Sequence, residues 1–221
     1  MALTKVIGAG LGTLTEDQVL GGATPTLTIG DADAEDAKII FDGNAQDYHI
    51  GLDDSADSLT IGLGSALGTT THMKFHSSGV ITKPLQTAFS AKAGGGQTNI
   101  AIGANTTVTV SEIFDRNADF GSNTFTAPVE GVYQLNANLY LGGLDSGANY
   151  IQAGIVTSNR GYYLVFSLNG FDADFSYLPI TISVLADMDA NDTALVSLFQ
   201  SGGSQQIDVD GGTYFTGYLV G

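Results

Sequence analysis

The sequence predicts an all-β fold, and three observations support this fold class. Short runs in which apolar and polar residues alternate recur along the chain, bounded by Gly, Pro, Asn or Asp, which is typical of strands joined by turns. Glycine accounts for 30 of the 221 residues and only 14% of the residues are charged, as suits turn-rich β structure. After Gln86 no stretch shows the periodicity of a helix.

The charge and the cysteine content exclude several functions. The chain carries 7 basic and 23 acidic residues, a net charge of −16, so we expect no binding to nucleic acid through its phosphates and repulsion of anionic polysaccharides. Without Cys there is no disulfide, thiolate nucleophile or Cys-zinc site. No apolar run is long enough to cross a bilayer, and the first residues lack the apolar core of a signal peptide, so we expect a soluble protein without membrane insertion.

Residues 1–24 form the first predicted segment. They are rich in Gly and apolar residues without helical periodicity, so their side chains need a surface that covers them. The segment resembles the short N-terminal anchor of many phage fibre proteins, with an unattached tail as the alternative. The resemblance implies that Val6, Ile7, Leu11 and Leu14 dock into other phage tail or capsid proteins.

An internal repeat follows the anchor. The sequence Leu-Thr-Ile-Gly at 27–30 recurs at 59–62, and each copy precedes a further predicted strand, at 38–43 and 73–79. Another short strand is predicted at 48–52. Repeated strands with acidic or Gly turns between them predict stacked β rungs.

The repeat segment, residues 25–85, is too small to bury a core of its own and would leave open sheet edges. A homotrimer removes both problems, because strands from three chains can close around one axis. The stretch IIFDGNAQDYHIGLDDSADSLTIGLG resembles the repeats of phage tail and head fibre proteins. We therefore predict a short intertwined β-repeat shaft that ends near Pro84, because proline stops the last strand.

Residues 86–221 predict a β-sandwich of short strands. In the most regular run, alternation places Tyr133, Leu135, Ala137 and Leu139 on one face. The predicted strands are Ala88–Ala91, Thr106–Val110, Thr124–Ala127, Val132–Leu141, Tyr150–Val156, Tyr162–Leu168, Phe175–Val184, Ala194–Gln200, Ser204–Val209 and Thr213–Val220.

A family resemblance covers this part of the chain. FTAPVEGVYQL at 125–135 resembles the signature of the complement C1q and tumour-necrosis-factor-like jelly roll, and 87–91, 191–198 and 214–219 resemble its first, late and closing strands in the same order. The resemblance implies a jelly-roll head and a homotrimer. Leu135 and Ala137 depart from the aromatic residues usual in the family, so no ligand site is carried over.

His72, Lys74 and His76 are the first candidates for a chemical site. They fall on a predicted strand, where residues two apart share a face, and three such rows could hold a metal at the axis of a trimer. A cation beside Lys74 would be poorly placed, so a solvated or packed row of histidines is favoured and no metal is predicted.

Asp187-x-Asp189-x-Asn191 begins like a calcium loop, but Asp192 and Leu198 stand where such a loop needs Gly and Glu. An acidic turn explains this sequence better.

The acidic residues of the sandwich stand in turns, with no His after residue 76, so no catalytic residue and no cofactor are predicted. We expect a protein that is not an enzyme, with a polysaccharide depolymerase as the enzymatic alternative.

Loops that combine aromatic rings with amide side chains are the candidate receptor-binding residues, since this mixture suits sugar or protein surfaces. The alternative for the rings is a place in the core or in the trimer interface. The candidates are Asn149, Tyr150, Asn159, Arg160, Tyr162, Asn169 and Phe171.

These resemblances together imply a structural fibre or spike protein on a phage virion, in its tail or on its capsid surface. The N-terminus attaches to the virion, and the trimeric head binds a host cell-surface glycan or protein. The main alternative is a capsid decoration or trimerisation module without a receptor role. A bacterial or matrix protein that uses the same head for protein binding is a third possibility.

Overall fold

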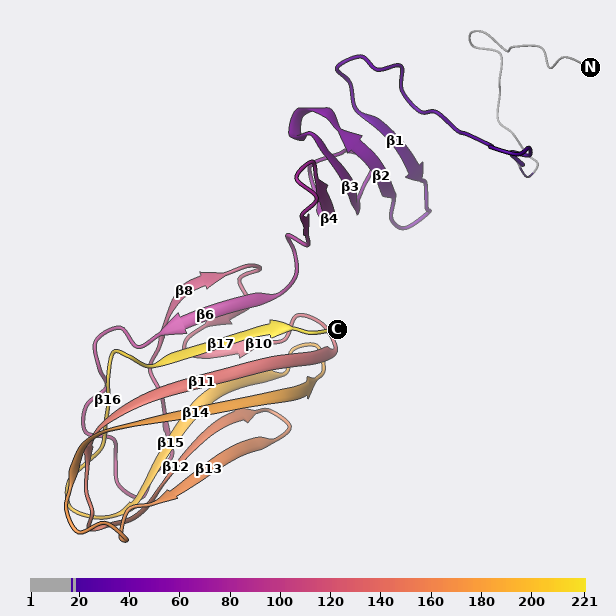
Figure 1. Ribbon diagram of the computed structural model, residues 1–221. Coiled ribbons are helices and arrows are strands. Elements are labelled where there is room, and N and C mark those ends of the chain that lie inside the picture. The colour runs from indigo at the N-terminus through magenta and orange to yellow at the C-terminus, as the bar shows by residue number, and fades with distance from the viewer. Residues whose placement is uncertain (1–16, 18) are drawn as a thin grey trace, which may run out of the picture. The chain divides into compact units, whose positions relative to one another are not determined.

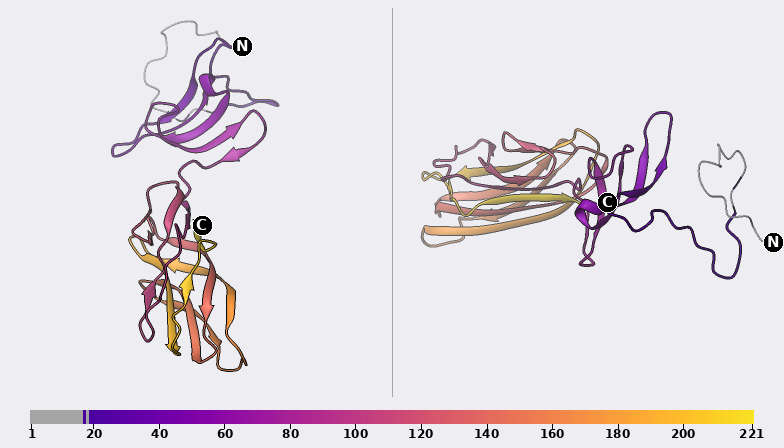
Figure 2. Two further views of the ribbon diagram at one scale, coloured as in Figure 1. Left: turned by 90° about the vertical axis from the view of Figure 1, so that its left-hand side faces the viewer. Right: turned by 90° about the horizontal axis from the view of Figure 1, so that it is seen from above.

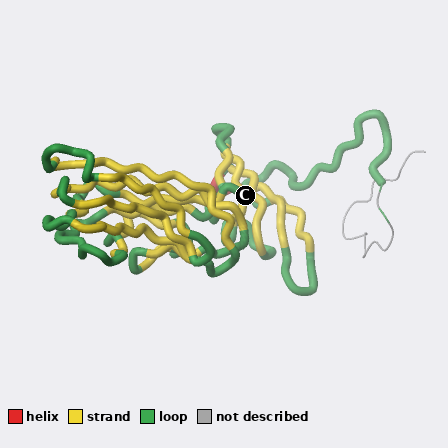
Figure 3. Tube along the Cα trace, turned by 90° about the horizontal axis from the view of Figure 1, so that it is seen from below, coloured by secondary structure: helices red, strands yellow, loops and turns green. Residues whose placement is uncertain are grey.

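The computed structural model describes residues 17 and 19–221. The chain divides into two compact units, residues 1–70 with 75–80 and residues 71–74 with 81–221. Strands build both units, and the described helical structure is a single turn at Asp54–Ala56 (Figure 3). The predicted all-β fold is confirmed. The predicted anchor residues Val6, Ile7, Leu11 and Leu14 lie outside the described residues.

The N-terminal sheet contains five strands in the order β1-β2-β3-β4-β5. β1 pairs with β2, and β2 with β3, in antiparallel register. The bounds are β1 Ala37–Phe41, β2 Tyr48–Asp53, β3 Ser58–Leu63, β4 Thr71–His76 and β5 Ile81–Thr82.

Two expectations for this segment are wrong. The strands form one continuous sheet in which β1, β2 and β3 are antiparallel, not stacked rungs, because each strand pairs with the next strand along the chain. Residues 27–30 also form no strand, although they repeat the sequence of residues 59–62, which lie in β3. A strand requires a neighbour for its backbone hydrogen bonds, and the described part of the chain provides none for the first copy.

The second unit contains a sandwich of two six-stranded sheets (Figure 1). In the first sheet the order is β14-β11-β17-β6-β8, with β16 also paired to β11. Its strands are β6 Ala88–Lys92, β8 Ser111–Asp115, β11 Gly131–Leu144, β14 Phe175–Met188, β16 Asp208–Val209 and β17 Tyr214–Leu219.

The second sheet packs against the first (Figure 2) and has the order β13-β12-β15-β10-β9, with β7 paired to β15. Its strands are β7 Thr106–Thr107, β9 Phe120–Gly121, β10 Thr124–Thr126, β12 Ala148–Thr157, β13 Gly161–Ser167 and β15 Thr193–Gly202. From β10 to β12 and from β13 to β15, the chain passes to the opposite sheet at every connection. This topology is jelly-roll-like, as predicted for the head.

Each predicted strand of the sandwich overlaps an observed one, and two of the observed strands are much shorter than predicted. Thr106–Val110 forms a strand only at Thr106–Thr107, and Ser204–Val209 only at Asp208–Val209. Val108 and Val110 turn into the core, and the amide of Val110 donates to Oδ1 of Asn123. The short strands β8 and β9 were not predicted.

The core lies between the two sheets. Tyr133, Leu135, Ala137 and Leu139 are all fully buried, as their alternation predicts. The Tyr133 hydroxyl donates to the Val129 carbonyl at 2.7 Å, which satisfies the one polar atom of this ring and fixes the turn between β10 and β11.

The sandwich has two distinct ends. The chain enters at Gln86, whose Nε2 donates to the Leu219 carbonyl, and the amide of Val132 donates to the carbonyl of Gly221. We call this the proximal end. At the opposite, distal end, Leu144 of β11 pairs with Phe175 of β14.

Candidate binding surface

The predicted receptor-binding residues do not form one patch. They belong to the β12–β13 hairpin and the loops around it, and the hairpin runs the length of the sandwich. Tyr150 pairs with Ser167 at the distal end, whereas the turn between the strands meets the proximal end, where the amide of Ser158 donates to the Thr193 carbonyl. Asn149, Tyr150, Asn169 and Phe171 are therefore distal, and Asn159, Arg160 and Tyr162 are proximal.

The turn of the proximal group is held in place by Asp192, which lies between β14 and β15. Both Asn159 Nδ2 and Ser158 Oγ donate to the carboxylate of Asp192, the latter at 2.7 Å. The Ser158 bond, followed by the Asp189 amide and the Asn159 amide, lowers the pKa of Asp192 below its ordinary value. Tyr162 packs against the core. Of the three predicted residues in this group, Arg160 is therefore the one whose side chain is exposed and takes part in none of these contacts.

The distal group surrounds an aromatic cluster. The Phe171 ring stacks on Phe166 at 5.9 Å and contacts Phe175 at 5.0 Å between centroids, yet 48% of Phe171 is exposed. Hydrogen bonds from the Phe171 amide to the Leu168 carbonyl, and from the Leu168 amide to the Asn149 carbonyl, attach this loop to the start of β12. Asn169 lies exposed in the same loop.

A hollow of about 510 Å³ opens beside this cluster, and we call it the aromatic pocket. Its lining residues come from the end of β13, the following loop and the start of β14. They are Phe166, Phe171, Asp172, Ala173, Phe175, Tyr177 and Leu178. A pocket of this size with aromatic walls and few polar groups has the character of a small-ligand site.

A second hollow of about 350 Å³ shares Phe175 and Tyr177 with the aromatic pocket. Gly142, which pairs with Tyr177, contributes space here, because a Cβ at Gly142 would contact the Tyr177 ring at 3.6 Å. The Tyr177 ring stacks on Tyr140 with an interplanar angle of 7°. Carboxylates line this hollow, from Asp174, Asp208 and Asp210.

The distal loops are held together by Asp145, which is buried. Its Oδ1 accepts from the Gly147 amide at 2.7 Å, and its Oδ2 accepts from the amides of Ser204 and Gln205. The bonds from Gln205, Ser204 and Gly147, in that order of effect, lower the pKa of this carboxyl group. Asp145 thus joins the loop after β11 to the loop after β15.

Phe171 is the one receptor-binding candidate from the sequence that lines the aromatic pocket, and Phe166, Phe175, Tyr177 and Leu178 were not predicted. These residues lie in strands, and only the pairing register shows that their ends meet at the same loop. One signal was present, since Phe171, Phe175 and Tyr177 follow one another closely after the Asn169-Gly170 turn.

The chemistry of the distal surface suits binding. Aromatic faces stack on apolar ring surfaces, and carboxylates accept hydrogen bonds from hydroxyl or amino groups.

Residues 17 and 19–221 contain no cluster of His, Cys, Asp or Glu suited to a metal ion. His72 and His76 lie on β4, a strand as predicted. Within the same residues, no helix is both long and apolar enough to span a membrane.

Comparison with known proteins gives similarity in structure only. No protein family and no curated protein matches the sequence. The chain is similar to the globular domain of zebrafish complement 1qA protein, with 19% identity and a TM-score of 0.46 over 62% of this chain and 98% of that chain. It is also similar to murine APRIL, with 10% identity and a TM-score of 0.44 over 61% of this chain and 99% of that one.

Proposed function

We propose that this chain is a homotrimeric fibre or spike protein of a phage virion, whose head binds a ligand on the host surface. The observation that carries the receptor role is the position of the aromatic pocket. The chain enters the sandwich at the proximal end, and the pocket lies at the distal end. A head attached through its N-terminus therefore presents this pocket away from the attachment point.

The charge of the distal surface restricts the ligand. Asp172, Asp174, Asp208 and Asp210 line the two hollows, and the whole chain has a net charge of −16. An anionic glycan would be repelled. We propose a neutral or amino-bearing saccharide, whose apolar ring face stacks on the exposed side of Phe171.

The homotrimer is supported by apolar side chains exposed on two different surfaces of the sandwich. Tyr163, Leu164 and Val165 are exposed on the edge strand β13, and Tyr214 and Tyr218 on the outer face of the other sheet. A contact between two different surfaces is heterologous, and such contacts close into a ring when the rotation allows. Three copies in a ring would also give avidity to a weak single site.

The alternative, a capsid decoration or trimerisation module, is favoured by the same exposed apolar surfaces. They suit self-association and need no receptor. The two functions differ in whether the aromatic pocket binds a ligand in the assembled trimer.

A matched pair of substitutions tests the receptor role. Phe171 and Phe114 are 48% and 47% exposed, but Phe114 lies on β8, away from the pocket lining. The purified full-length Phe171→Ala variant should bind arrayed neutral and amino-bearing bacterial glycans roughly tenfold more weakly than the unchanged protein, as for an aromatic hot-spot residue. Phe114→Ala should bind normally.

The mass of each variant in solution completes the experiment. Equal binding by both variants, or no glycan binding by the unchanged trimer, would contradict the proposed receptor role. Loss of the trimer in Phe171→Ala alone would place this ring between copies of the chain and would favour the trimerisation module.

A further inference from the structure

Among residues 17 and 19–221, no segment buries the apolar face of the N-terminal sheet. Cross-strand pairing places Ile39 beside Ile50, and Phe41 beside Tyr48, on one face of β1 and β2. Leu59 of β3 continues this face beside Leu52. All six side chains are between 37% and 55% exposed. We call the surface of Ile39, Phe41, Tyr48, Ile50, Leu52 and Leu59 the apolar face.

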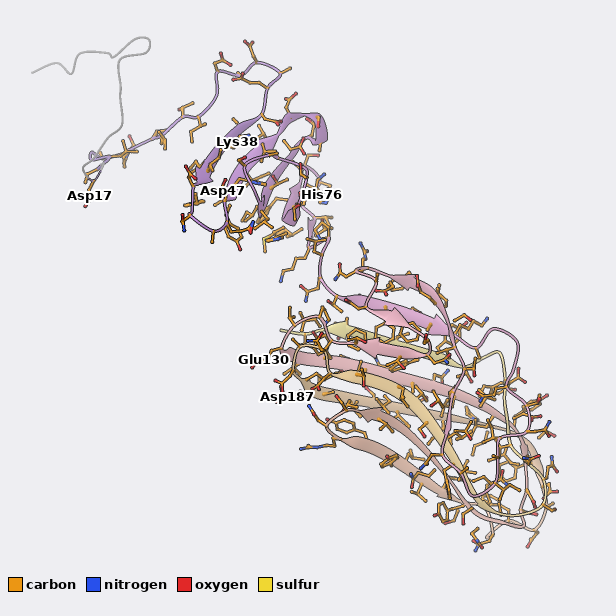
Figure 4. The ribbon with its side chains drawn as sticks, turned by 180° about the vertical axis from the view of Figure 1, so that it is seen from behind. Asp17, Lys38, Asp47, His76, Glu130 and Asp187 are labelled. Atoms are coloured by element: carbon orange, nitrogen blue, oxygen red, sulfur yellow. The ribbon has the colours of Figure 1, made fainter. Side chains whose placement is uncertain are left out.

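On β2 and β3 the opposite face of the sheet consists of small or polar residues that are buried, and on β1 it continues with Lys38 and with Ile40, which is 41% exposed. His49 is fully buried, and its Nδ1 donates to the Gly64 carbonyl at 2.8 Å. The Lys38 ammonium donates to the Ser65 carbonyl at 2.7 Å, and a Cβ at Gly51 would collide with Leu67. Residues 64–70 therefore cover this face. Lys38 is labelled on the sheet in Figure 4.

This arrangement reverses the usual polarity of a half-buried antiparallel sheet, in which apolar side chains face the core and polar ones face water. The exposed parts of the six side chains amount to roughly 500 Å² of surface, near the upper range for the largest apolar patch on a monomer. Exposure of such an area of apolar surface to water is unfavourable. Burial of this face therefore requires a further surface that the described residues do not provide.

The absence of charged side chains on the apolar face fits a second copy as the molecule that covers it. With a net charge of −16, two copies repel each other unless they meet through an uncharged surface. The apolar face carries no charged side chain, whereas Asp42, Asp47, Asp54 and Asp57 lie in the turns at the ends of its strands. A pair of such faces brings apolar side chains together and leaves the carboxylates in solvent.

The sequence repeat supports an interface between copies. Leu27 and Ile29 are 65% and 44% exposed, although the same residues in the second repeat, Leu59 and Ile61, lie in β3. Ile29 also lines a shallow hollow of about 240 Å³ together with Ile50 and others on the apolar face. A segment with the sequence of a strand thus lies at the margin of the face without a strand partner among the described residues of its own chain.

We propose that the apolar face packs against the apolar faces of neighbouring copies, with residues 27–29 at the margin of this interface. The proposal rests on the trimer of the proposed function and names the surface through which the N-terminal sheets meet. It is independent of whether the aromatic pocket binds a ligand.

The absence of Cys from the sequence makes a direct test possible. In the full-length protein, Ile50→Cys places one thiol in the apolar face. Ser65→Cys places one in the exposed loop over the opposite face. We expect a short bis-maleimide or mild oxidation to join two chains of Ile50→Cys and none of Ser65→Cys. A water-soluble maleimide should label the thiol of Ile50→Cys at least tenfold more slowly than the thiol of Ser65→Cys.

The mass in solution separates the outcomes. A trimer in which the Ile50→Cys thiol is labelled as quickly as the control, without cross-links, would overturn this proposal and leave the trimer of the heads intact. A monomer would overturn both. Slow labelling without cross-links would mean that something other than a second copy covers the face, and it would also overturn the proposal. Leu52→Cys repeats the measurement if Ile50→Cys does not fold.

Discussion

At the scale of single residues, Asp145 is the clearest link between sequence and the distal surface. Each of its two oxygens accepts at least one backbone amide hydrogen bond, from Gly147 on one side and from Ser204 and Gln205 on the other. An asparagine cannot replace it, because its NH₂ group would face an amide N–H donor in either orientation. The loop after β11 and the loop after β15 thus depend on a single carboxylate.

Asp145→Asn should therefore lower the melting temperature of the sandwich at pH 7. The hydrogen bonds hold the pKa of Asp145 below its ordinary value of 3.8, so their stabilising effect is complete above that pH and is lost as the pH falls through the lowered pKa. Calorimetry should show that the melting temperature of Asp145→Asn is below that of the unchanged protein at pH 7, and that this difference in melting temperature is smaller at pH 3.

Asp187→Asn is the control, because Asp187 is an exposed carboxylate on β14, labelled in Figure 4 beside Glu130 at the proximal end. It should melt as the unchanged protein does. If Asp145→Asn also melted normally, the network of Asp145 would not stabilise the distal loops.

Residue patterns predicted the interior better than the surface. Leu135 and Leu139 are in the core because strict alternation has a single physical outcome when one face is buried. Asn159 and Phe171 have equally suggestive sequence contexts but lie at opposite ends of a hairpin. Which loops meet depends on strand length and register, and a local pattern contains neither.

At the scale of elements, the long strands were predictable and the short strands β8 and β9 at the sheet edges were not. β11 and β15 carry sustained alternation, whereas β8 exposes both Ile113 and Phe114 and so lacks a two-residue period. Residues 27–30 show the converse error, since a good strand sequence remains without pairing when the described part of its chain offers no neighbour.

The closing strand β17 gives a test at this scale. A Cβ at Gly217 would lie 2.5 Å from the Phe89 ring and 2.7 Å from Leu135, so this strand fits the core only with glycine. Gly217→Ala should destabilise the protein by about 1–3 kcal/mol, the usual cost of overpacking a core. Chemical denaturation measures the loss.

Gly121→Ala is the matched control, because Gly121 lies in β9 with no atom within 4 Å of the added methyl group. It should unfold at nearly the same denaturant concentration as the unchanged protein. Equal stability of both variants would show that β17 can shift to accept a side chain.

At the scale of the whole molecule, the proposed trimer must form against the charge of its copies. Each chain contributes a net charge of −16. Because a chain has 7 basic and 23 acidic residues, few ion pairs are available across an interface between copies. Apolar contacts are therefore expected to hold the copies together, through the apolar face and through the exposed side chains of β13 and β17.

This balance predicts the effect of salt on assembly. Raising the NaCl concentration from 0.02 to 0.3 M, about a fourfold shortening of the screening length, weakens the repulsion between copies and leaves apolar burial in place. The trimer should therefore persist to lower protein concentration in the higher salt, as measured by light scattering across a dilution series. Dissociation on adding salt would mean that ion pairs hold the copies together, which would contradict an interface built from the uncharged face of the N-terminal sheet.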